Sequence, residues 1–177
     1  FPTRRSSDLI TGGTWAGGSV SGGGDVNGDG FDDIVLHGTY LVYGKAGGFP
    51  ASIDVWSLRG ADGARINNGF DGFTITYGAR VHNPVAIAGD VNGDGLDDII
   101  VGNPGFLDVG ESDYPEIGET YLVYGRAGGF PSGFDLNDID GSNGFLLAGV
   151  DAYDQSGFGV SGAGDVNGDG FDDLVIG

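Results

Sequence analysis

The chain has 177 residues and a formal net charge of −19, with 26 acidic residues, 7 basic residues and no cysteine. This acidity argues against nucleic acid and anionic membrane surfaces as partners, because both are polyanions that bind basic patches, and it favours cations. The lack of cysteine excludes disulfides and thiolate metal sites, so any bound metal would be a hard ion with oxygen ligands.

Glycine decides the expected secondary-structure class. The chain contains 39 glycines and 6 prolines, and the longest stretches free of both, 3–11 and 51–59, have nine residues each. An average helix of about 11 to 12 residues hardly fits anywhere. No apolar run approaches the roughly 18 residues of a membrane span. Since 39% of the residues are hydrophobic, we expect a folded all-β chain of short strands.

The first nine residues, FPTRRSSDL, differ in composition from everything that follows. They contain two of the seven basic residues and no glycine. One codon reading of this segment corresponds to a sequencing-library adapter, so our hypothesis is that residues 1–9 are a non-native scar. A native disordered tail is the alternative.

Two strings recur along the rest of the chain. GDVNGDGFDDIVL begins at Gly24, GDVNGDGLDDIIV at Gly89 and GDVNGDGFDDLVI at Gly164, while YLVYGKAGGFP from Tyr40 returns as YLVYGRAGGFP from Tyr121. The spacing varies because of insertions, chiefly an acidic one at 105–119. We expect two full repeats and the start of a third, at roughly 12–76, 77–150 and 151–177.

Each repeat contains short β-branched and aromatic segments between turn signals. In the second repeat they predict strands at 99–101, 120–125 and 145–149, and in the third a strand at 158–164. About four strands per repeat are typical of a propeller blade or a sandwich module.

The Asp-rich loop of each repeat carries side-chain oxygens at loop positions 1, 3, 5 and 9. Glycine at position 6 permits a sharp turn, and the carbonyl of position 7 can point inward. With one bidentate carboxylate or a water, these groups reach the roughly 6 to 8 oxygens that Ca²⁺ prefers. We expect up to three Ca²⁺ ions, held by Asp25, Asn27, Asp29, Phe31 and Asp33, by Asp90, Asn92, Asp94, Leu96 and Asp98, and by Asp165, Asn167, Asp169, Phe171 and Asp173.

The loops resemble two other structures, an EF-hand and an ordinary turn. An EF-hand needs a bidentate Glu at position 12, where this chain has Leu36, Val101 and Ile176. Apolar runs follow each loop, so we expect a loop between two strands rather than between two helices. Asp-Asn-Gly clusters also form ordinary turns, but a turn needs only one or two such residues.

At these residues the sequence resembles the FG-GAP repeat family, known from the β-propeller of integrin α subunits and from bacterial surface proteins. The third repeat, GFGVSGAGDVNGDGFDDLVIG, fits best. The Phe-Gly positions read Gly18-Ser19 in the first repeat and Asn83-Pro84 in the second, and His37-Gly38-Thr39 replaces the first Gly-Ala-Pro. These departures put local blade packing in doubt, whereas the calcium loops show none.

The resemblance implies a seven-bladed propeller whose blades have four antiparallel strands, with calcium in hairpin loops on one face. The chain would supply about two and a half blades, either as a fragment or as one of several assembling chains. An open fragment would expose inter-blade apolar faces and strand edges.

The expected function is a calcium-rigidified, non-catalytic propeller of a secreted or cell-surface protein. Its partner would be an extracellular protein or glycan, with no nucleic acid and no membrane span. The sequence lacks GxSxG, HExxH and cysteine-nucleophile elements, and His37 and His82 stand at non-equivalent positions. The alternative is an accessory propeller of a larger extracellular enzyme, of a phospholipase or polysaccharide-active type.

Overall fold

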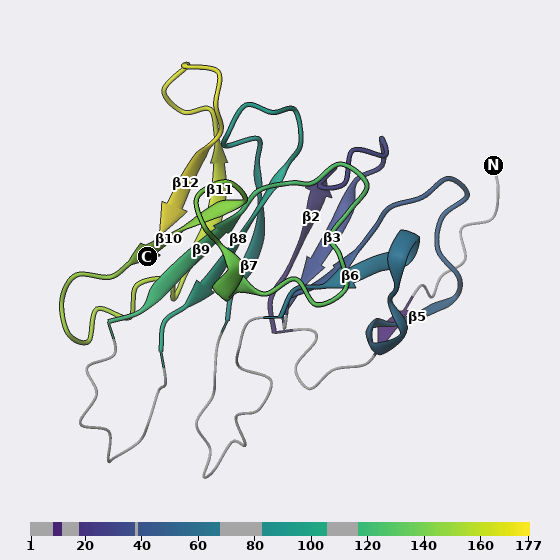
Figure 1. Cartoon of the computed structure of the whole chain (residues 1–177), viewed down its shortest axis with the longest axis horizontal. Helices are drawn as coiled ribbons and strands as arrows, with labels where there is room; N and C mark the ends of the chain where they lie inside the picture. The colour runs from purple at the N-terminus through teal and green to yellow at the C-terminus, as the bar shows by residue number, and fades with distance from the viewer. Residues whose placement is uncertain (1–8, 12–17, 38, 68–82, 106–116) are drawn as a thin grey trace, which may run out of the picture.

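The computed structural model describes residues 9–11, 18–37, 39–67, 83–105 and 117–177. Within these ranges the protein is all-β, as the glycine spacing predicts (Figure 1). Helical structure there is confined to three 3₁₀ turns of three residues each, at η1 (Val55–Ser57), η2 (Gly60–Asp62) and η3 (Leu136–Asp138). No helix in the described ranges has the length and apolar character needed to cross a bilayer.

Two four-stranded antiparallel sheets and one hairpin follow one another along the chain. The first sheet, blade 1, has the order β2 (Val20–Gly24), β3 (Asp33–Leu36), β4 (Tyr40–Val42) and β6 (Gly63–Arg65). The second, blade 2, has the order β7 (Val85–Gly89), β8 (Asp98–Asn103), β9 (Glu119–Val123) and β10 (Gly144–Ala148). The hairpin, blade 3, is β11 (Val160–Gly164) with β12 (Asp173–Ile176). The predicted strands and the four-stranded blades are thus confirmed.

A separate two-stranded parallel pair lies beside blade 1. It joins β1 (Leu9–Thr11) to β5 (Ser52–Asp54), with Ile10 opposite Ile53. Of the proposed scar at 1–9, only Leu9 lies within the described residues. The parallel bridge between Asn67 and Asp135 connects blade 1 to the segment after β9 in a similar way.

The first strands of the three blades lie side by side (Figure 1), with β7 in contact with both β2 and β11. Serine hydroxyls at the start of blade 1 are hydrogen-bonded to strand β7 of blade 2. Ser19 Oγ accepts the N–H of Val85 at 3.1 Å, and Ser21 Oγ accepts the N–H of Ile87 at 3.1 Å. Ser19 occupies a position where the sequence departs from the Phe-Gly pattern, so this departure contributes a direct inter-blade contact.

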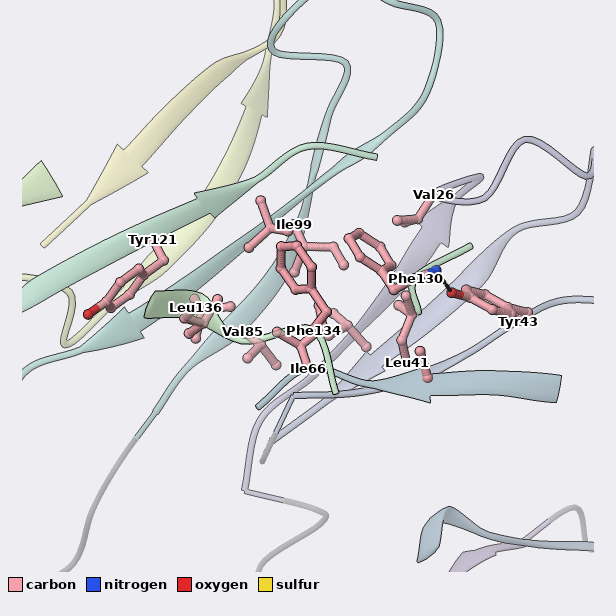
Figure 2. Packing of buried hydrophobic residues seen from close by; sticks show 14 residues of the cluster. Val26, Leu41, Tyr43, Ile66, Val85, Ile99, Tyr121, Phe130, Phe134 and Leu136 are labelled. Atoms are coloured by element: carbon pink, nitrogen blue, oxygen red, sulfur yellow. Dashed lines mark hydrogen bonds between the residues drawn. The ribbon is translucent and has the colours of Figure 1, made fainter. Parts of the chain in front are cut away.

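The largest core cluster fills the space between blades 1 and 2 (Figure 2). Val35 and Leu41 come from blade 1, Ile99 from blade 2, and Phe130 and Phe134 from the connection between β9 and β10. Strand alternation sends the next residue of each strand to the opposite face. Ile100 and Leu122 therefore join a second cluster with Val160, Leu174 and Ile176 of blade 3. The blades are held together by apolar layers, which positions their loops relative to one another.

Candidate metal centres in the hairpin loops

The three Asp-rich loops connect the first and second strands of their blades, at the same end of the sheets (Figure 1). We call residues 25–33 loop 1, residues 90–98 loop 2 and residues 165–173 loop 3. Each lies in an antiparallel hairpin, so the expected placement between strands is confirmed.

The first aspartate of each loop is bound by backbone N–H groups of the same loop. Asp25 Oδ1 accepts the N–H groups of Gly28 at 2.8 Å and Asp29 at 3.0 Å, and its Oδ2 accepts that of Gly30 at 2.8 Å. Asp90 and Asp165 make the same three bonds in their loops. Gly30 has φ +87°, a left-handed conformation that side chains disfavour, which explains glycine at position 6.

Positions 3 and 5 meet in the first two loops. The amide Nδ2 of Asn27 donates to Asp29 Oδ2 at 3.1 Å, and Asn92 donates to Asp94 at 2.9 Å. In loop 3, Asn167 instead donates to position 9, Asp173, at 3.3 Å. The asparagine at position 3 is thus hydrogen-bonded to the aspartate at position 5 in loops 1 and 2 and to the aspartate at position 9 in loop 3.

The aspartate at position 9 has a structural role that the sequence did not reveal. Asp33 is fully buried, and its two oxygens accept the N–H groups of Val26 at 2.9 Å and Gly44 at 2.8 Å. Asp98 repeats this arrangement with Val91 and Gly125. Each of these carboxylates thus ties its own loop to the end of the third strand.

Burial dominates the electrostatics of position 9. Desolvation raises the pKa of Asp33 to about 6 and that of Asp98 to about 7, against the lowering effect of their backbone hydrogen bonds. The neighbouring loop aspartates raise both values further because like charges disfavour ionisation. A cation bound in the loop would offset both the desolvation of the charged carboxylate and its repulsion by the neighbouring aspartates.

The donor set suits a hard cation, but the loops are not preformed cages. Every predicted side-chain ligand offers oxygen, which is the ligand atom that calcium takes. Within the described ranges, no three or more acidic or histidine side chains come together as a metal-binding cluster. Calcium binding would therefore require the loop carboxylates to draw together, and the ligand assignments, including the carbonyls of Phe31, Leu96 and Phe171, remain predictions.

The predicted ligand pattern does not include the aspartate at position 8. In blades 2 and 3 this residue is hydrogen-bonded to the preceding blade. Asp97 Oδ2 accepts the N–H of Asp25 at 2.7 Å, and the Asp97 N–H donates back to the Asp25 carbonyl at 3.2 Å. Asp172 and Asp90 make the same pair of bonds, at 2.9 and 3.1 Å. The signal was the first aspartate of each Asp-Asp pair, which recurs at position 8 although the ligand set does not need it.

The side chain at position 7 also touches the preceding loop. A Cβ added to Gly28 would lie 3.0 Å from Leu96, and one added to Gly93 would lie 2.4 Å from Phe171. Loop 1 is covered further by the segment after β9, where the N–H groups of Arg126 and Gly128 donate to the carbonyls of residues 26 and 27. Loops 1 and 2 are thus each packed under the blade that follows.

Coverage decreases along the chain. The valine at position 2 is 0% exposed in loop 1 and 71% exposed in loop 3, at Val26 and Val166. Loop 1 has blade 2 above it, whereas loop 3 has no following blade within the described residues.

The fold and the loops define an all-β chain of propeller-type blades with Asp-rich hairpins. Residues 85–122 match the FG-GAP repeat family. The chain is 37% identical over 106 residues to integrin alpha-8 of Mus musculus, a match that covers 59% of this chain and 9% of that protein. It is 29% identical over 171 residues to integrin alpha pat-2 of Caenorhabditis elegans, which covers 87% of this chain and 12% of that protein.

A further similarity, to integrin alpha-E of Homo sapiens, is 31% over 161 residues, covering 86% of this chain and 12% of that protein. These findings support the FG-GAP and integrin α resemblance carried by the motifs. The chain spans only about a tenth of the length of these relatives.

Proposed function

We propose that the chain is a calcium-binding, non-catalytic propeller segment that acts in adhesion or protein interaction at the cell surface or outside the cell. The integrin α relatives support an interaction domain and an extracellular location. The partner would be an extracellular protein or glycan that contacts the blades while calcium stiffens their loops.

One observation carries the calcium assignment. The carboxylate at position 1 folds over its own loop through the same three backbone hydrogen bonds in all three copies, at Asp25, Asp90 and Asp165. These bonds hold the position 1 carboxylate over the same turn that carries the predicted ligands at positions 3 and 5. Bound calcium would neutralise the loop carboxylates, whose mutual repulsion otherwise opens the turn.

The expected affinity suits an extracellular setting. Extracellular calcium modules have Kd values of about 10⁻⁴ to 10⁻³ M. At millimolar calcium and a Kd of about 0.1 mM, each site would stabilise the fold by about 1.4 kcal/mol. Three such sites would contribute about 4 kcal/mol, which is comparable to the whole stability of a small domain.

Thermal unfolding of the 177-residue chain tests this proposal in millimolar calcium, in magnesium and in chelator. We expect calcium to raise the Tm and magnesium to do little, because Mg²⁺ demands near-octahedral geometry and dehydrates reluctantly. The matched control replaces position 5 in every loop by Asp29→Ala, Asp94→Ala and Asp169→Ala. A wild-type Tm that is the same in calcium and in chelator would exclude the proposal.

Adhesion needs its own measurement. Binding of the immobilised chain to extracellular matrix proteins and to glycans should be detected in calcium and lost in chelator, with the position 5 triple variant as the metal-free control. Binding that is equally strong in chelator would show that calcium has no part in recognition.

A further inference from the structure

We infer that the aspartates at loop position 8 are positioning residues that couple neighbouring calcium loops, with Asp97 ordering loop 1 and Asp172 ordering loop 2. This inference rests on the calcium binding proposed above. It adds that the affinity of one loop depends on a side chain of the next blade, 72 residues away in the case of Asp97 and Asp25.

The contact is made at the residue that begins the loop. The Asp97 carboxylate accepts the N–H of Asp25, and the Asp97 N–H donates to the carbonyl of Asp25. Both backbone groups of the first predicted ligand are therefore held by one residue of blade 2. The side-chain bond is the shorter of the two, 2.7 Å against 3.2 Å, and a hydrogen bond to an ionised carboxylate is about twice as strong as a neutral one.

Close packing leaves the Asp97 carboxylate little freedom. A Cβ added to Gly24, the residue before Asp25, would lie 2.7 Å from the Asp97 Cγ. Asp172 lies even closer to its counterpart, since a Cβ on Gly89 would lie 2.0 Å from its Oδ2. Glycine at the end of the first strand admits the carboxylate in both interfaces.

The coupling follows from the adjacency of positions 8 and 9. Asp98 is a predicted ligand of loop 2, and Asp97 is its neighbour in the chain, so a metal that orders loop 2 also orders the contact with loop 1. The Asp97 carboxylate adds a negative charge beside loop 1, which strengthens the attraction for a cation there. Removal of the side chain should weaken calcium binding most in the preceding loop, where the carboxylate holds the backbone of the first predicted ligand.

Blade 1 provides the matched control. Asp32 occupies position 8 of loop 1, is exposed, and makes no hydrogen bond or ion pair within the part of the chain that the structure describes. Asp32→Ala therefore removes the same charge from the same loop position without removing an inter-blade contact.

The experiment is a calcium titration of the ¹⁵N-labelled 177-residue chain, followed at the amides of Gly30, Gly95 and Gly170, one in each loop. We expect Asp97→Ala to raise the calcium midpoint of Gly30 about tenfold, which is about 1.4 kcal/mol, and to leave Gly170 unchanged. Asp172→Ala should shift Gly95 in the same way, while Asp32→Ala should shift neither. Asp97→Asn keeps an acceptor oxygen and should restore most of the Gly30 affinity.

The outcomes separate the two proposals. If the wild-type glycine amides do not respond to calcium, the proposed function fails. If they respond, and Gly30 titrates alike in wild type and in folded Asp97→Ala, the coupling is refuted while calcium binding stands. Should Asp97→Ala not fold, Asp172→Ala gives the same decision through Gly95, and an unshifted Gly95 midpoint refutes the coupling.

Discussion

The hydroxyl oxygen of Tyr43 accepts a hydrogen bond from the backbone N–H of Phe130 at 2.8 Å, across 87 residues of chain. Tyr43 belongs to the first copy of the YLVYG string, and Phe130 ends the second copy of the AGGF string. Figure 2 shows this bond at the edge of the core between blades 1 and 2. The two copies of the repeated string are thus hydrogen-bonded to each other across the contact between blades 1 and 2.

We predict that Tyr43→Phe destabilises the chain by about 1 to 3 kcal/mol, because a buried N–H is left without an acceptor. Urea unfolding at fixed calcium measures the change. Tyr124→Phe is the control, since Tyr124 is the equivalent residue of blade 2 and its hydroxyl makes no hydrogen bond within the described ranges. Equal losses in the two variants would contradict the assigned role of the bond.

Asp33 should matter for folding even without metal. Its carboxylate satisfies the N–H groups of Val26 and Gly44, both buried, so Asp33→Ala should lower the free energy of unfolding in chelator by roughly 2 kcal/mol or more. Asp29→Ala, in an exposed part of the same loop, should lower it by about 1 kcal/mol or less. If the two variants unfold alike in chelator, position 9 acts as a ligand alone.

The metal-free chain should be more stable in mild acid. The pKa of Asp98 is raised to about 7 and that of Asp33 to about 6, from 3.8, so the folded state binds these protons more tightly than the unfolded state. This stabilisation is complete below the unfolded pKa of 3.8 and is lost as the pH rises through 6 to 7. In chelator, the Tm at pH 5 should therefore exceed the Tm at pH 8.

The variant Asp98→Asn controls for the general repulsion of a chain with a net charge of −19. It should show a smaller Tm difference between pH 5 and pH 8 than the wild type. An unchanged difference would mean that overall charge, and not the buried carboxylate, sets the pH dependence.

The inter-blade core should dominate stability. Ile99 is fully buried between blades 1 and 2, and Ile99→Ala should lower the free energy of unfolding by about 2 to 5 kcal/mol, because a cavity remains. Val150 is 86% exposed, so Val150→Ala should change it by no more than about 0.5 kcal/mol. A small effect of Ile99→Ala in denaturant unfolding would indicate blades that fold independently.

The sequence by itself determined the all-β class, the repeat and the strands. Short apolar segments between glycines can form only strands of a few residues, and this local rule predicted β8, β9, β10 and β11. The sequence also predicted the sharp turn at loop position 6, where the left-handed backbone of Gly30 disfavours most side chains.

Only the tertiary structure decided how the blades use their polar residues. Asp97 and Asp98 are neighbours in one loop, yet Asp98 binds its own blade and Asp97 binds the preceding blade. The partner of Asp97 is 72 residues away, and that of Tyr43 is 87 residues away. Contacts of this kind depend on how the apolar faces stack one blade against the next, and no local pattern in the sequence encodes that geometry.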